Sequence, residues 1–255
     1  MPSFSDRPVH ASLGAWRAVS VQGAMERARH ASEPFLGPIS LAHTQICPQN
    51  PGKLTVDDAE TLRLTFPATQ FRLHANAQVA GWSSQADAST FGEHEGYFHT
   101  LSRVSEALGA RAYTWHAGRR KHADLNMVLW RTRALADEWG IDVGIEGLYP
   151  TPDDRYLLST WDEYEMLLRS KVKFALDLSH LNILAHRHGR ENKSWLVQEL
   201  LQSDACIEIH FSGNDGDADT HGQLASEPWW WEFLDRANPD AVIFSEGGQV
   251  RPTFY

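Results

Sequence analysis

Six consecutive apolar segments of this chain each end in a side chain that can bind a metal ion. The segments span residues 70–74, 111–116, 141–146, 172–177, 206–210 and 241–246. His180 follows Asp177 by three residues, and Asp219 and His221 form an Asp-x-His pair on a later polar loop. Imidazoles and carboxylates brought together without cations would repel one another or lose their hydration. The pattern therefore predicts a divalent-metal site.

Nine side chains make up the candidate ligand set. They are His74, His116, Glu146, Asp177, His180, His210, Asp219, His221 and Glu246. One divalent ion takes about four to six ligands, so nine ligands can serve one to three ions of manganese, magnesium, cobalt, zinc or iron. A single strand-end histidine is more often a hydrogen-bonded structural residue, and a single strand-end carboxylate often caps a helix. Six successive segments that end this way favour metal binding.

The segments that carry these residues alternate with helical patterns. Apolar residues recur at i, i+3 and i+4 over residues 98–108, 124–139, 161–169 and 193–202. Another strand is expected over residues 39–43, and an eighth near residues 15–21. This alternation predicts a parallel α/β fold, and the strand count favours a (β/α)8 TIM barrel over a doubly wound sheet.

One domain over residues 1–255 is predicted, because no linker or internal repeat divides the chain, and the barrel pattern is clearest over residues 39–248. The strands of such a barrel all point the same way, so the six strand-end side chains should meet at the carboxyl end of the barrel. Barrel enzymes carry their chemistry at that end.

The charge of the chain restricts its partners. The chain has 255 residues and a formal net charge of −10. Because nucleic acids and anionic membranes are bound mainly through lysine and arginine, we expect neither DNA nor a membrane as a partner. The one basic cluster is Arg119, Arg120 and Lys121, directly after His116. The two cysteines form no disulfide framework, so we expect a cytoplasmic protein. With nucleic acids and membranes set aside, we expect a small-molecule substrate.

The strand-end pattern also resembles a known group of proteins. Glu146, Asp177-x-x-His180, His210, Asp219-x-His221 and Glu246 are similar to the metal-binding motifs of the xylose isomerase-like TIM-barrel superfamily. This superfamily includes sugar isomerases, sugar epimerases and the endonuclease IV group. The resemblance implies a metal-dependent enzyme, and three of its branches each match part of the pattern.

The isomerase and epimerase branch is the favoured interpretation. Its resemblance implies one divalent metal held by Glu146, Asp177, His210 and Glu246. The two glutamates would then also move protons on a carbon beside a carbonyl group, and His180 would bind the substrate. The substrate implied is a small, sugar-like molecule.

Two other branches remain open. Resemblance to endonuclease IV implies three zinc ions held by all nine candidate ligands and the hydrolysis of a phosphoester. A partial resemblance to the iron-dependent, peptide-modifying family of the methanobactin biosynthesis enzyme implies oxidative chemistry with a peptide and a partner protein. The tryptophans 229–231 could then form a contact surface, although packing against the barrel is the simpler role for them.

Overall fold

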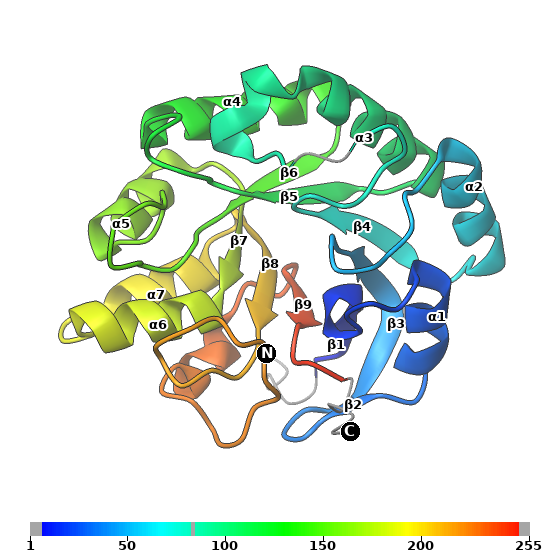
Figure 1. Cartoon of the computed structure of the whole chain (residues 1–255). Helices are drawn as coiled ribbons and strands as arrows, with labels where there is room; N and C mark the ends of the chain where they lie inside the picture. The colour runs from blue at the N-terminus through cyan, green and yellow to red at the C-terminus, as the bar shows by residue number, and fades with distance from the viewer. Residues whose placement is uncertain (1–6, 83–84, 250–255) are drawn as a thin grey trace.

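Eight parallel strands close into a barrel with helices around the outside, as Figure 1 shows along the barrel axis. The computed structural model describes residues 7–82 and 85–249. The barrel strands are β1 (Val9–Ser12), β3 (Gly37–Ile46), β4 (Gln70–His74), β5 (Ala112–His116), β6 (Asp142–Glu146), β7 (Phe174–Asp177), β8 (Cys206–Phe211) and β9 (Val242–Ser245). The pairing of β1 with both β9 and β3 closes the barrel. This confirms the predicted (β/α)8 TIM barrel.

The helices lie between the strands in the order that the periodicity predicts. They are α1 (Val21–Ala28), α2 (Val56–Thr65), α3 (Glu95–Leu108), α4 (Leu125–Trp139), α5 (Trp161–Ser170), α6 (Leu178–His188) and α7 (Ser194–Gln202). Asp124 and Thr160 accept a backbone N–H at the starts of α4 and α5, as N-cap residues do. The four helices expected from the sequence are α3, α4, α5 and α7.

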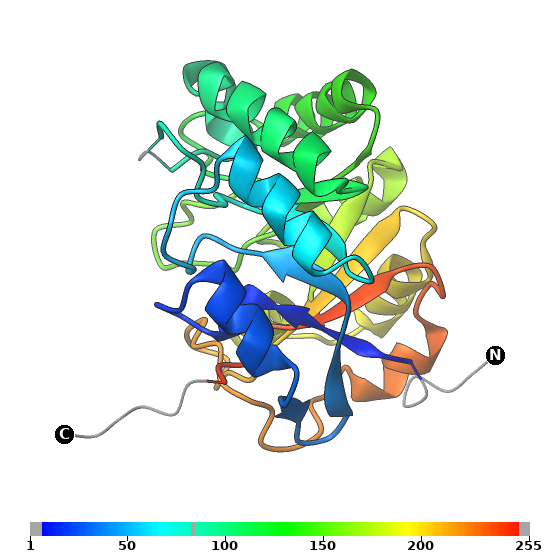
Figure 2. The same cartoon turned by 90° about the vertical axis from the view of Figure 1, so that its right-hand side faces the viewer.

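The remaining elements are short. Three-ten helices are η2 (Leu13–Ala15), η3 (Ala88–Glu93) and η4 (Trp231–Arg236), and β2 (Ser32–Glu33) pairs antiparallel with β3 outside the barrel. The η4 helix packs its buried Phe233 and Leu234 against the core. In Figure 2, which views the barrel from the side, β1 and β9 lie next to each other and helices α1 to α3 cover the face toward the viewer.

The predicted position of the eighth strand was wrong. The strand is β1 at Val9–Ser12, whereas residues 15–21 contain the end of η2, a turn and the start of α1. Ala18 has φ of 61°, which an extended strand does not tolerate, and Ser20 caps α1 by accepting the N–H of Gly23. β1 escaped detection because it has only four residues and contains the polar His10.

Two further expectations concern surfaces. Trp230 is buried, and Trp229 and Trp231 are partly buried and pack against the core. The tryptophan segment therefore packs against the barrel. Within residues 7–82 and 85–249, no helix combines the length and the hydropathy that crossing a bilayer requires.

Candidate metal centre

Strand register places the predicted ligands beside one another. His116 of β5 pairs with Glu146 of β6, and Asp177 of β7 pairs with His210 of β8. Glu246 directly follows β9, whose Phe244 pairs with His210. The carboxyl ends of the strands therefore bring these side chains together, as the sequence pattern predicts.

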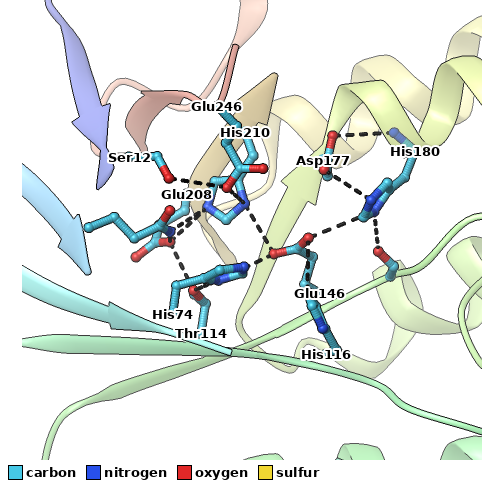
Figure 3. Close-up of polar contacts among 12 residues, drawn as sticks. Ser12, His74, Thr114, His116, Glu146, Asp177, His180, Glu208, His210 and Glu246 are labelled. Atoms are coloured by element: carbon cyan, nitrogen blue, oxygen red, sulfur yellow. Dashed lines mark hydrogen bonds and ion pairs between the residues drawn. The ribbon is translucent and has the colours of Figure 1, made fainter. Parts of the chain in front are cut away.

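Glu146 lies in the middle of the cluster (Figure 3). Its Oε2 atom lies 3.0 Å from His210 Nδ1 and 3.6 Å from His74 Nδ1. Its Oε1 atom lies 3.7 Å from His180 Nδ1 and 3.8 Å from His116 Nε2. One buried carboxylate thus has two imidazoles beside each of its oxygens.

The other predicted ligands form a chain of alternating carboxylates and imidazoles. His180 Nε2 lies 3.3 Å from Asp177 Oδ2 and 3.5 Å from Asp219 Oδ2. His221 lies 3.0 Å from Asp219 Oδ2 through Nε2 and 3.6 Å from Glu246 Oε2 through Nδ1. Because Glu246 Oε1 also lies 3.7 Å from the Nδ1 atom of His210, the structure brings all nine predicted ligands into one cluster.

The turn after β7 shows how local structure aims two of these side chains. Asp177 Oδ1 caps α6 by accepting the N–H groups of Ser179 and His180, so Oδ2 is left to face the cluster. His180 donates its Nδ1 proton to the carbonyl oxygen of Gly147 at 2.8 Å. That bond leaves Nε2 facing Asp177 and Asp219. Helix capping and a place in the cluster are therefore compatible roles for Asp177.

A second loop holds the Asp-x-His pair. Gly213 and Gly222 exchange backbone hydrogen bonds of 2.7 and 2.8 Å at its base. Asp219 and His221 both face the cluster, although the segment that carries them is not an extended strand. His221 has φ of 49°, a left-handed conformation that costs energy for a residue with a Cβ atom. Its carbonyl oxygen is fixed by the N–H of Gly248.

Three buried polar atoms of the cluster indicate that it can hold a metal ion. Glu146 Oε2, His210 Nδ1 and Asp219 Oδ1 are buried without a well-aligned hydrogen bond among the described residues, although the first two atoms lie 3.0 Å apart. Such atoms are rare in folded proteins and indicate a missing ion or ligand. Three overlapping groups have ligand atoms close enough to share an ion. They are His74, His116 and Glu146; His74, His210 and Glu246; and Glu146, Asp177 and His180.

Burial and close charges shift the titration of the cluster. Burial opposes ionisation of Glu146, but the imidazoles of His74 and His210 lower its pKa well below the usual range. Burial, together with the neighbouring His210 and His116, lowers the pKa of His74 to about 3. Burial also disfavours the charged form of His210, yet the neighbouring carboxylates raise its pKa well above the usual value. Burial raises the pKa of Glu246 to about 7. Without a cation, protons on imidazole balance part of the carboxylate charge.

A cavity of about 310 Å³ opens onto this cluster. Seven of the nine predicted ligands line it, while Asp177 and His210 lie below its surface. The rim includes Arg119, Tyr149 and Tyr156. The Tyr149 ring centre lies 5.2 Å from that of His180 and 5.9 Å from that of Tyr156. The cavity has the size of a small-molecule site.

The predicted basic cluster divides into separate roles. Arg120 binds both carboxylate oxygens of Glu163 at 2.6 and 2.9 Å, so it serves the structure of the loop. Arg119 is exposed at the cavity rim and is the only lysine or arginine among the described lining residues.

Sequence reasoning missed the residues that contact the cluster from β1, β3 and β8. Ser12 donates to Glu246 Oε1 at 3.4 Å, and its Oγ atom lies 3.1 Å from Cys47 Sγ. Glu208 Oε2 accepts the Nε2 proton of His210 at 2.9 Å. Glu208 could have been found, because alternation along β8 points residues 208 and 210 to the same side. Ser12 could not, because β1 itself was misplaced.

No protein-family model matches the sequence, and no curated protein matches it. Solved structures do match the fold. A D-tagatose 3-epimerase-like protein is 18% identical over 96% of this chain and 92% of its own, with a TM-score of 0.68. An AP endonuclease of family 2 from Brucella melitensis is 14% identical over 94% and 93%, with a TM-score of 0.62. The IOLI protein with a bound zinc atom is 10% identical over 94% and 88%, with a TM-score of 0.60.

This chain has the fold of the xylose isomerase-like TIM barrels. The structures of this fold that it matches are mostly enzymes, and they include both an epimerase-like protein and an AP endonuclease. At sequence identities of 10–18%, these matches show a shared barrel fold and not a shared activity. The chemistry of this barrel has to be inferred from its own side chains.

Proposed function

We propose that this protein is a multinuclear metal-dependent hydrolase that acts on a phosphoester of a small molecule. The observation that carries the proposal is the position of Glu146, with two imidazoles beside each carboxylate oxygen. A carboxylate so placed suits ligation of two ions at once. A single-ion isomerase site needs no such bridge, and it leaves His116 and the Asp219–His221 pair without a metal-binding role.

The three overlapping groups, each of which contains Glu146 or His74, would hold the ions. Asp219 lies beside them, next to His180 and His221. Bound divalent cations would supply Lewis acidity and lower the pKa of water. Glu146, Asp177, Asp219 and Glu246 carry four negative charges when ionised. One divalent ion would leave this set negative and suited to a neutral substrate, whereas three would make it positive and suited to an anion such as phosphate.

The chain's own residues also favour a small anionic substrate. Arg119 at the cavity rim can bind phosphate oxygens with its guanidinium group. Tyr149 and Tyr156 offer ring faces and hydroxyl groups to the rest of the substrate. The small cavity and the net charge of −10 argue against a DNA duplex.

The test is hydrolysis of bis(p-nitrophenyl) phosphate and p-nitrophenyl phosphate by metal-loaded protein. We expect p-nitrophenolate release that Glu146→Gln lowers at least ~100-fold, more than the loss of a supporting residue would. Arg119→Gln should raise KM about tenfold and change kcat little, as expected for one lost charged hydrogen bond. Asp142→Asn, a half-exposed change at the other end of β6, is the matched control. No release with zinc, manganese, cobalt or iron would contradict the proposal.

The second candidate is the isomerase or epimerase expected from the sequence. It is favoured by Glu146 and Glu246, which line the same cavity as a pair of carboxylates. Two carboxylates in one cavity are groups that can remove and return a proton on a substrate carbon. Interconversion of ketohexoses by protein holding a single manganese or cobalt ion, without phosphoester hydrolysis, would support this candidate over the hydrolase.

A further inference from the structure

A second layer of polar side chains lies directly below the ligand cluster. We call Gln45, Arg72, Thr114 and Glu208 the supporting layer. Arg72, Thr114 and Glu208 each stand two residues before a predicted ligand, namely His74, His116 and His210. Because side chains alternate along a strand, they point into the same barrel interior, one step deeper. Barrel interiors are normally filled by apolar side chains, so a charged layer at this depth calls for an explanation.

Glu208 is the centre of this layer and is fully buried. Its Oε1 atom accepts a hydrogen bond from Arg72 Nη1 at 2.9 Å. Its Oε2 atom accepts from Gln45 Nε2 at 3.0 Å and from Thr114 Oγ1 at 3.1 Å, besides His210 Nε2 at 2.9 Å. An ionised carboxylate has no proton to donate, so all four neighbours must point a hydrogen at it.

These directions fix a proton on each of two histidines. His210 Nε2 also lies 3.0 Å from Gln45 Nε2, but a bare Nε2 would set its lone pair against the Glu208 carboxylate 2.9 Å away. His210 must therefore keep a proton on Nε2, while Nδ1 faces Glu146 and Glu246. The Thr114 hydroxyl gives its only proton to Glu208, so it can only accept from His74 Nδ1, 2.9 Å away. His74 then carries its proton on Nδ1, and its Nε2 nitrogen holds the free lone pair.

We propose that Glu208 is a positioning residue for two candidate metal ligands on different strands: it holds the Nε2 proton of His210 directly and, through Thr114, the Nδ1 proton of His74. One buried carboxylate thereby fixes the orientation of both imidazoles and the place of one proton on each. The claim rests on the proposed function only in taking His74 and His210 as metal ligands. The positions of these two protons are properties of the metal-free protein.

The first variant is Thr114→Val, which keeps the shape of the side chain and removes the hydroxyl link. Thr132→Val is its matched control, because Thr132 is also fully buried and its Oγ1 accepts the Trp115 indole N–H, away from the cluster. Both variants lose one buried hydroxyl, so both should lose similar stability. Only Thr114→Val should affect His74, and Thr114→Ser should restore the original behaviour.

The second variant is Glu208→Gln. A glutamine has a single acceptor oxygen, which the charge of Arg72 will attract. Its NH2 group would then face the donors Gln45, Thr114 and His210. That conflict should release the His210 ring from its fixed orientation and, through Thr114, allow both tautomers of His74.

The readout is imidazole 15N NMR of metal-free protein at pH 8, with His74 identified by comparison with His74→Gln. We expect native His74 protonated at Nδ1 alone, and a mixture of His74 tautomers in both Thr114→Val and Glu208→Gln. Native tautomers retained in Thr114→Val and Glu208→Gln would overturn the proposal, and so would native His74 protonated at Nε2.

The second readout is metal affinity, measured by competition with a chromophoric chelator. Loss of a supporting hydrogen bond should weaken binding about 10–100-fold in Thr114→Val and Glu208→Gln. Thr132→Val should bind as the native protein does, and unchanged affinity in all three variants would overturn the positioning role. If native protein binds no metal, the proposed function fails, while the NMR result still decides whether Glu208 fixes the His74 tautomer.

Discussion

The ligand cluster and the supporting layer are both buried and charged, but they differ in how completely their atoms are paired. In the supporting layer, Glu208 accepts four hydrogen bonds and its charge is balanced by Arg72. In the cluster above it, atoms of Glu146, His210 and Asp219 are buried without a well-aligned hydrogen bond among the described residues. A complete polar network stabilises and orders a fold, whereas an incomplete one indicates a ligand. The difference predicts that changes in the two layers damage different properties.

The largest expected effect is the loss of metal binding in Glu146→Gln. The change removes the charge from the carboxylate that lies beside four imidazoles. We expect affinity for metal to fall more than ~100-fold, beyond the effect of a supporting residue. Elemental analysis and competition titration would measure it.

Native metal affinity in Glu146→Gln would contradict this prediction. Because neighbouring imidazoles stabilise the charged form of Glu146 in the metal-free protein, the comparison is made at a temperature at which the variant is folded.

Loss of stability, rather than loss of metal binding, is expected for Arg72→Met in the supporting layer. This change leaves Glu208 buried without its counter-charge, which typically costs about 3–5 kcal/mol. At about 2–4 °C per kcal/mol for a chain of this size, the melting temperature should fall by roughly 10 °C. Calorimetry of the metal-free protein would measure this fall, and an unchanged melting temperature would remove the distinction between the two layers.

Metal binding should weaken as the pH falls below 7. The pKa of metal-free Glu246 is about 7, and nearby carboxylates raise the pKa values of His180 and His210 well above the usual value. These groups hold protons at pH 6 that must leave before a metal can bind. Each released proton lowers the apparent affinity about tenfold per pH unit below its pKa. Calorimetric titration between pH 6 and 8 in two buffers would count the protons, and a flat profile would contradict the prediction.

The smallest effect is expected outside both layers. His188 is an exposed histidine at the end of α6, and no metal role was assigned to it from the sequence. His188→Asn should leave the metal content unchanged and alter the free energy of unfolding by less than about 0.5 kcal/mol. Loss of a metal equivalent in this variant would mean that histidine content alone, and not the cluster, decides binding.

Much of this organisation could be predicted from the residues at the strand ends. The six strands from β4 to β9 were found because each is a buried apolar run that ends in a polar residue. All nine candidate ligands were named because parallel strands deliver their ends to one place, although their binding of metal stays a prediction. β1 was not found, because four residues that include His10 give too short a pattern.

The supporting layer could be predicted only in part. Glu208 and Arg72 stand two residues before His210 and His74, which indicates a shared direction. Their ion pair joins β8 to β4 across the barrel interior, a contact between distant segments that no local pattern reveals. The proton positions that follow from this layer depend on the distances of three hydrogen bonds, so they required the structure.

The most direct test of the central claim is a count of metals per chain, made by elemental analysis of protein purified without chelator or added metal. A multinuclear centre predicts about two to three ions per native chain and a lower count in Glu146→Gln. Zinc would agree with the proposed hydrolysis, whereas iron would favour the oxidative chemistry implied by the resemblance to the iron-dependent, peptide-modifying family. No more than one ion per native chain, after incubation with excess zinc, manganese or iron, would contradict the multinuclear account.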